Sequence, residues 1–227
     1  MKPTSPVWAE FSSGAGWEVS LNATGFNHVN LLLDYARAYH RAARRSLDSV
    51  NRALQDENCS QTPSDMDAHP IVFLYRHALE VYLKTVIVFG NHLRGLRGEF
   101  EVPWKDIFTR HKLVDLLPSV QEVLEQAHCS GIWVAPSFQT FSDVRQMVET
   151  IDEVPHAALR YPVGMKGNQV GQLLPDGVHF NVHTFAAKLD ALLYLLDQAA
   201  QGTWQTFQQE GLSHPMIRDQ IRAYFQS

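Results

Sequence analysis

The stretch from residue 70 to 89, PIVFLYRHALEVYLKTVIVF, constrains the fold more than any other part of the chain. It is apolar on most sides of a helix, yet Arg76, Glu80 and Lys84 follow one another at four-residue intervals and therefore share one face. A helix of this kind belongs inside a bundle of helices, so the charges on its remaining face must be paired or functional. The sequence therefore predicts a central helix that carries a buried charged stripe.

Apolar residues recur with a helical period in several further segments, which favours a mainly α fold. Helices are predicted at residues 26–54, 118–128, 137–154, 178–200 and 214–225. Gly90, Gly95 and Gly98 predict that the central helix ends at Phe89 and gives way to a loop. Thr109 is expected to cap the start of the next short helix, and Pro118 suits the first turn of the one after it.

The chain is expected to form one helical domain with a segment on either side. We assign residues 1–24 to an N-terminal arm, 25–202 to the helical domain and 203–227 to a C-terminal helical extension. The loop of residues 163–177, before the last long helix, could form a small β-hairpin because it ends in the turn signal Pro175-Asp176-Gly177. The predicted fold class is a mainly α helical bundle with a short arm and this hairpin.

Composition narrows the class of protein and its compartment. The net charge of -5 argues against a general nucleic-acid coat, although a local basic patch is compatible with it. Cys59 and Cys129 are too few and too far apart to indicate a disulfide framework or a zinc site. The first residues lack the apolar core of a signal peptide, and no apolar run is long enough to span a membrane. We therefore expect a cytoplasmic protein with no membrane contact.

Three separated motifs together resemble the HEPN superfamily, whose name denotes nucleotide binding in higher eukaryotes and prokaryotes. They are the central helix with Glu80 and Lys84, the segment TRHKLVDL at residues 109–116, which fits T-x-H-x-L-x-x-L, and Arg160-Tyr161-Pro162 before the last long helix. The resemblance covers residues 70 to 200. It implies a helical bundle, a homodimer, and a role in RNA cleavage, in toxin–antitoxin pairs or in defence against phage.

The chain departs from the family at the nuclease motif. Catalytic members carry Arg-x(4–6)-His near the start of the last helix, and two copies meet across the dimer. No arginine of this chain has a histidine at that distance, although His183 could occupy the family's histidine position. We therefore expect little or no ribonuclease activity. If the chain does cleave RNA, the candidate catalytic residues are His183, His111 and Arg160.

The charged stripe has two interpretations. In the first it is scaffold, with Glu80 bridging Arg76 and Lys84 beside His111 and ordering the core without chemistry. In the second it is a binding site, in which cations and an imidazole converge on a phosphate. The residues of this candidate site are Arg76, Glu80, Lys84, His111, Arg160 and Tyr161. Burial of these side chains would indicate scaffold, and an open cleft would indicate a site.

Two further patterns carry weaker signals. His179 and His183 are four residues apart and could bind zinc, but the neighbouring glutamate of a metalloprotease is missing, so we predict no metal and no cofactor. Five arginines of the first long helix could meet RNA phosphates, although a solvated helix face is the more common explanation. These arginines are Arg37, Arg41, Arg44, Arg45 and Arg52.

Taken together, the sequence favours a HEPN-like interaction or nucleotide- and RNA-binding component of a bacterial defence or toxin–antitoxin type system. One alternative is an RNA endonuclease toxin with a variant active site. A second is a purely structural protein that binds a partner. The expected partners are a second copy of the chain, RNA or a nucleotide, and a protein from the same system.

Overall fold

A computed structural model of the chain describes residues 28–56, 64–99, 101–127, 138–153 and 180–213. These residues form six α-helices and one short 3-10 helix. They are α2 (His28–Gln55), α3 (Asp65–Arg97), α4 (Trp104–Thr109), η1 (Leu113–Asp115), α5 (Leu117–Gln126), α6 (Phe141–Asp152) and α8 (Val182–Ser213). The prediction of a mainly α helical bundle is therefore confirmed for the part of the chain that the structure describes.

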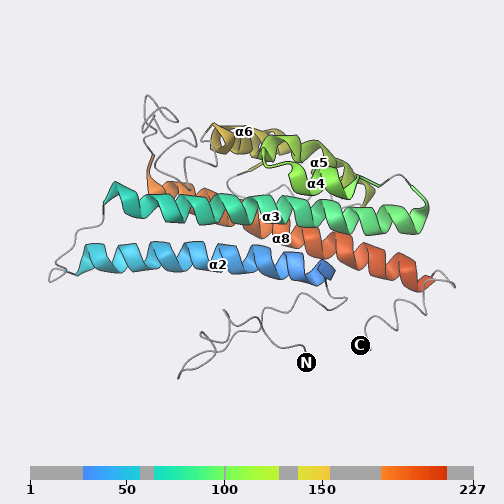
Figure 1. The fold of residues 1–227 in the computed structure, drawn as a ribbon, viewed down its shortest axis with the longest axis horizontal. Coiled ribbons are helices and arrows are strands. Elements are labelled where there is room, and N and C mark those ends of the chain that lie inside the picture. Colours follow the sequence, from blue (N-terminus) through green and yellow to red (C-terminus); the bar gives the residue numbers. More distant parts are fainter. Residues whose placement is uncertain (1–27, 57–63, 100, 128–137, 154–179, 214–227) are drawn as a thin grey trace, which may run out of the picture.

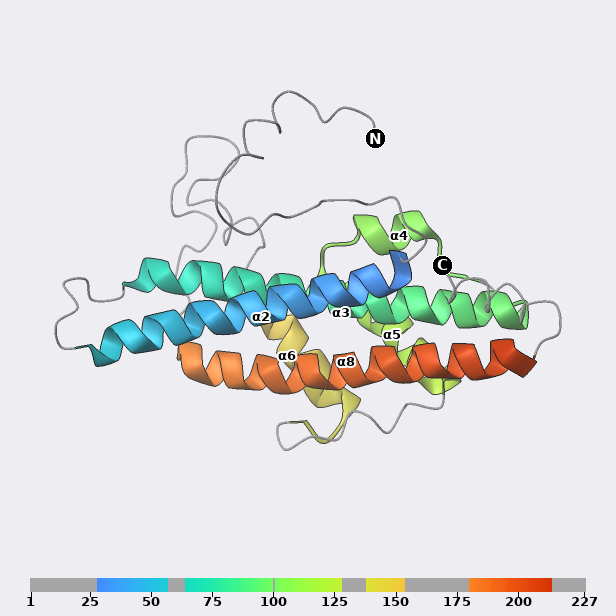
Figure 2. The ribbon, with the colours of Figure 1, turned by 90° about the horizontal axis from the view of Figure 1, so that it is seen from below.

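Three long helices form the body of the molecule (Figure 1). α3 and α8 run in the same direction, and α2 runs antiparallel to both. The short helices α5 and α6 lie on the side of α3 and α8 that faces away from α2, and α4 lies beside α3 on the flank away from α8 (Figure 2). Because it is covered by α2, by α8 and by the short helices, α3 contributes most of the large fully buried side chains, among them Tyr75, Leu79, Tyr82 and Phe89.

α3 continues eight residues beyond the predicted end at Phe89, and its glycines explain why. A Cβ atom on Gly90 would lie 2.2 Å from a methyl carbon of Val123 in α5, so this glycine allows two helices to approach each other and does not break α3. Gly98 has the left-handed φ of 70° and donates its N–H to the carbonyls of Arg94 and Gly95, which ends the helix. Only this last glycine acts as the sequence predicted.

The segment after α3 also differs from the prediction at Thr109. Instead of capping the start of a helix, Thr109 is the last residue of α4, and its hydroxyl donates to the carbonyl of Lys105 at 2.7 Å. Because a threonine hydroxyl can donate to a carbonyl of the preceding turn, threonine is compatible with the last turn of a helix as well as with its N-cap. Pro118 does lie in the first turn of α5, as predicted.

α8 begins later and ends later than predicted. Its first turn follows Asn181, whose side-chain oxygen accepts the N–H of Thr184 at 2.9 Å. The helix then passes through Gly202 to Ser213, so residues 203–213 of the expected C-terminal extension continue it. Trp204 packs against Phe89, with ring centroids 5.2 Å apart, and this contact offsets the helix cost of the glycine, about 1 kcal/mol.

Three predictions fall outside the described residues. They concern the N-terminal arm at residues 1–24, the hairpin within 163–177 and the short helix at 214–225.

Candidate functional site

The charged stripe of α3 is buried and internally paired. Arg76, Glu80 and Lys84 are only 5%, 5% and 6% exposed. The ammonium of Lys84 donates to Glu80 Oε1 at 2.7 Å, and a guanidinium nitrogen of Arg76 lies 3.7 Å from Glu80 Oε2. Lys84 also lies 3.5 Å from the carbonyl oxygen of Phe108, at the end of α4. The two ion pairs predicted from the four-residue spacing are therefore present, and none of these three side chains lines an open cleft.

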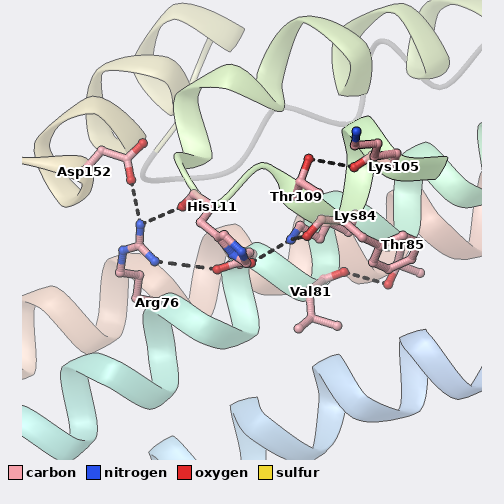
Figure 3. Close-up of polar contacts among 10 residues, drawn as sticks. Arg76, Val81, Lys84, Thr85, Lys105, Thr109, His111 and Asp152 are labelled. Atoms are coloured by element: carbon pink, nitrogen blue, oxygen red, sulfur yellow. Dashed lines mark hydrogen bonds and ion pairs between the residues drawn. The ribbon is translucent and has the colours of Figure 1, made fainter. Parts of the chain in front are cut away.

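His111 joins this stripe from the segment between α4 and η1 (Figure 3). Its Nδ1 lies 2.9 Å from Glu80 Oε1, and its carbonyl accepts a hydrogen bond from Arg76 at 3.0 Å. Its side chain is nevertheless 54% exposed, far more than those of its partners. His111 therefore connects the buried charges with the protein surface.

Asp152, at the end of α6, completes the group and was missed by the sequence reasoning. It accepts a hydrogen bond from Arg76 at 3.0 Å through one oxygen and from the backbone N–H of Val114 at 2.8 Å through the other. The signal for it was present in α6, because Val144, Val148 and Asp152 follow one another at four-residue steps and both valines are buried. We call Arg76, Glu80, Lys84, His111 and Asp152 the Glu80 cluster.

The Glu80 cluster neutralises itself. Its two permanent cations face two carboxylates, and Arg76 Nε is its one buried nitrogen without a hydrogen-bond partner. Burial alone would raise the pKa of Glu80, but hydrogen bonds from Lys84 and His111 outweigh it and hold that pKa below its ordinary value. The carboxylate therefore stays ionised, and the buried part of the cluster has the geometry of a scaffold.

Next to Asp152, an open hollow of about 740 Å³ is lined by residues of both η1 and α6. Four carboxylates and two cations line it. They are Asp115, Glu149, Asp152, Glu153, Lys112 and Arg145. An excess of carboxylates repels anions, so a phosphate would not favour this side of the cluster.

Residues 104–112 carry exposed cations and aromatic rings, and Lys112 among them also lines the hollow. Lys105 and Lys112 are exposed, and Arg110 has a side chain that is 40% exposed and 3.8 Å from Asp106. We call Lys105, Arg110, His111 and Lys112 the cationic strip. Trp104 and Phe108 stand beside it on α4 and are 47% and 41% exposed.

A second polar system joins α2 to α8 and was not predicted. Asp197 accepts two hydrogen bonds from Arg37, at 2.7 and 3.1 Å. Asp190 lies 2.6 Å from His40 Nε2 and 3.7 Å from Arg44 Nε. One heptad further along, His183 Nε2 lies 2.6 Å from the side-chain oxygen of Asn51. We call these residues the α2–α8 ladder: Arg37, His40, Arg44, Asn51, His183, Asp190 and Asp197.

The ladder has a regular spacing that explains its geometry. Residues 183, 190 and 197 of α8 are seven apart, and so are their partners 51, 44 and 37 of α2 in reverse order. Seven residues make about two helical turns, so each set occupies one face of its helix. This repeat is the sequence signal that would have found the ladder.

Two tyrosines of α3 also donate hydrogen bonds to the aspartates of the ladder. Tyr75 donates its hydroxyl to Asp190 at 3.0 Å, and Tyr82 donates to Asp197 at 3.3 Å. Burial raises the pKa of both phenols, and the neighbouring carboxylates raise it further. Both therefore remain neutral donors at physiological pH.

The structure separates the two histidines that were candidates for catalysis. Because Tyr75 pairs with Asp190 and Tyr82 with Asp197, His183 stands at the level of residue 68 on α3. Glu80, which holds His111, is twelve residues further along, which corresponds to about 18 Å of helix. Within one chain, His183 and His111 therefore do not form a common site.

The other predicted residues are placed only in part. Arg160, Tyr161 and His179 lie outside the described residues. Arg37 and Arg44 belong to the ladder, and Arg44 is nevertheless exposed, as are Arg41, Arg45 and Arg52, which is expected of a solvated face. Within the described ranges, no three or more side chains of histidine, cysteine, aspartate or glutamate gather closely enough to hold a metal ion. No described helix is long and apolar enough to cross a membrane.

Comparison with known proteins adds no relative. No protein-family model, curated protein or solved structure matches this chain. Fold and function must therefore be argued from its own residues.

Proposed function

We propose that this protein is an RNA- or nucleotide-binding component that contacts phosphates through the cationic strip. The observation that carries the proposal is a local reversal of charge. The chain as a whole has a net charge of -5, yet residues 105–112 hold three permanent cations against one carboxylate, Asp106. Phosphate backbones bind to clustered lysines and arginines, and most of the affinity comes from the counterions that are released.

The Glu80 cluster supports this proposal as the foundation of the strip. It fixes His111 through Glu80 and through the bond from Arg76 to the His111 carbonyl, so the strip is attached to the most buried helix. A surface whose backbone is already ordered loses less entropy when a ligand binds. The cluster is then scaffold for a neighbouring binding surface, and the phosphate does not reach Arg76 or Lys84.

The proposal is tested by removing equal charge from two surfaces. Lys105, Arg110 and Lys112 are changed to alanine in one variant, and Arg41, Arg45 and Arg52 of α2 in the control. We expect the first variant to bind a 20-nucleotide RNA at least tenfold more weakly. The slope of log K against log salt concentration should become shallower by about 2, since each single-strand phosphate contact contributes about 0.7 to that slope. Equal losses in both variants, or no binding by the parent at 50 mM salt, would contradict the proposal.

The absence of the Arg-x(4–6)-His motif leads us to propose a binding role and not a nuclease role. An arginine stabilises the charge that develops on the phosphate during cleavage, and losing one such contact costs about 10²–10³ in rate. The assay incubates the parent, His183→Ala and His111→Ala with structured and single-stranded RNA. Cleavage by the parent that disappears in either variant would establish the alternative, a ribonuclease with a variant site.

The biological setting stays a prediction from the resemblance to HEPN proteins, namely a bacterial defence or toxin–antitoxin type system with a protein partner. We also propose a homodimer formed through α2 or α8, because such long helices can pair by two-fold symmetry. Tyr35 of α2 and Tyr194 of α8 are 47% and 63% exposed and supply apolar area for this contact. Sedimentation as a monomer at micromolar concentration would contradict the dimer.

A further inference from the structure

Trp104 and Phe108 form an unusual aromatic pair on the surface. They lie four residues apart on α4, with ring centroids 5.9 Å apart and ring planes only 4° from parallel. Among the ring pairs of the described residues, this is the one in which both members are exposed. Large aromatic side chains lose the hydrophobic benefit of burial when they remain in water, so an exposed pair of this kind marks an interaction surface.

The helix that carries the pair, α4, is anchored to the core and to α3. Ile107, roughly a quarter turn around α4 from the pair, is 1% exposed, so this helix is anchored in the core. Asn91 of α3 makes two hydrogen bonds to the backbone of Val102, at 2.7 and 2.9 Å, just before α4 begins. The rings therefore do not need to be ordered when a ligand arrives, which favours binding.

His92, whose ring lies next to that of Trp104, places no positive charge beside the aromatic pair. The ring of His92 lies 6.3 Å from that of Trp104 and 5.8 Å from that of Phe207. Burial lowers the pKa of His92, although the charge of Glu101 opposes this effect. A neutral imidazole leaves the outer face of the indole as an ordinary π-surface for another ring.

The charges around the pair indicate the ligand. Lys105 and Arg110 stand next to the two rings in the sequence, and His111 and Lys112 follow, so a partner that combines planar rings with negative charge fits this segment. Single-stranded nucleic acid has this chemistry, since proteins bind it by stacking bases on aromatic rings while cations follow the backbone. A duplex conceals the faces of its bases within the stack and offers only its phosphates and groove edges.

We propose that Trp104 and Phe108 are a stacking platform for unpaired nucleobases, so that the ligand of the cationic strip is single-stranded nucleic acid. This inference rests on the proposed function, which requires only phosphate contacts. Parallel rings suit it, because successive bases of a strand stack with parallel planes and can continue the order of the pair. The platform supplies the preference for unpaired strands, and the strip supplies charge.

The experiment compares Trp104→Leu and Phe108→Leu with the control Phe180→Leu, which removes an aromatic ring that is 46% exposed and precedes α8. Each protein, checked for its fold by circular dichroism, is titrated with a single-stranded 20-nucleotide RNA, the matching DNA, the duplex RNA and inorganic polyphosphate. We expect each platform variant to bind single-stranded RNA at least tenfold more weakly, in line with typical losses when a stacking ring is removed. Binding of polyphosphate and duplex RNA should be unchanged, and Phe180→Leu should match the parent.

The outcomes separate the two proposals. If the variants bind single-stranded RNA as the parent does, while the cationic-strip variant does not, the platform is wrong and the proposed function stands. If polyphosphate binding falls as much as RNA binding, the rings do not contact bases and the platform is again wrong. If the parent binds none of these ligands, both proposals fail. Selective loss for RNA or for DNA alone supports the platform and identifies the strand that it accepts.

Discussion

The Glu80 cluster and the α2–α8 ladder use the same kinds of groups in different surroundings. In the cluster, Glu80 is shared by Lys84 and His111 and its side chain is 6% exposed. In the ladder, Asp197 is shared by Arg37 and Tyr82 and its side chain is 15% exposed, while that of Asp190 is 35% exposed. Water can replace a lost partner in the ladder much more easily than in the cluster.

Because of this difference in exposure, the Glu80 cluster and the ladder have different structural roles. If a buried carboxylate loses its cations, or the cations lose their carboxylate, water cannot solvate the remaining charge. The cluster therefore strongly favours the one arrangement in which all its members are paired. The ladder repeats a similar contact every seven residues, and its regular spacing fixes how far α2 and α8 slide past each other. The cluster thus stabilises the attachment of α4 and α6 to α3, and the ladder defines the register of the long helices.

The largest expected effect comes from breaking the cluster. Glu80→Ala leaves two buried cations without their shared carboxylate and should lower the free energy of unfolding by about 3–5 kcal/mol. Glu80→Gln keeps the volume and one acceptor for Lys84, so its loss should be smaller. Urea denaturation of both variants measures the difference. An alanine variant as stable as the parent would mean that these charges are solvated.

Breaking the ladder should cost less. Asp197→Asn weakens the paired hydrogen bonds from Arg37 and should cost about 1.5–3 kcal/mol, the range for hydrogen bonds to charged groups. A double-mutant cycle with Arg37→Gln isolates the pair from the bond to Tyr82. A coupling energy near zero would show that the two side chains do not support each other, and the ladder would lose its proposed role in register.

Acid should test the charge state of the Glu80 cluster. The pKa of Glu80 is lowered in the folded protein, so its contribution to stability is complete above the ordinary glutamate pKa, about 4.3, and is lost as the pH falls through the folded-state value. The stability difference between the parent and Glu80→Gln should therefore shrink between pH 6 and pH 3. A difference for Glu80→Gln that does not change with pH would contradict the assigned pKa shift.

The smallest effect is expected at the exposed end of the ladder. Asn51→Ala removes the contact with His183, where both side chains reach water, and should change stability by no more than about 0.5 kcal/mol. Thermal denaturation of Asn51→Ala and Asp197→Asn, each relative to the parent, compares the two stability losses. A loss above about 1 kcal/mol would show that this contact carries more of the α2–α8 register than its exposure suggests.

The range of each interaction along the chain explains what could be predicted. Arg76, Glu80 and Lys84 are spaced four residues apart, so a single helix already determines that they meet, and the central helix and its ion pairs were found. His111 was placed beside Glu80 with the help of the family resemblance. Asp152 is 76 residues from Arg76, and Arg37 is 160 residues from Asp197, so neither pair follows from local spacing.

The glycines and the aromatic pair illustrate a different limit. Gly90 looks like a helix breaker until the methyl groups of Val123 are known to lie against it, because a close approach between helices is a property of the pair. Trp104 and Phe108 have the four-residue spacing of ordinary core residues, and only the structure shows that their shared face points to water. Periodicity predicted the helices, whereas exposure had to be seen.

The parallel direction of α3 and α8 also governs the order in which this protein can fold. Every ladder contact between these two helices joins residues 115 apart, whereas α2 and α3 follow each other closely in the chain. During synthesis, α2 and α3 can therefore pair first, and Tyr75 and Tyr82 must wait for the carboxylates of α8. Closing so long a loop slows folding, so we expect the arrival of α8 to be the rate-limiting event and α2–α3 to form an early hairpin.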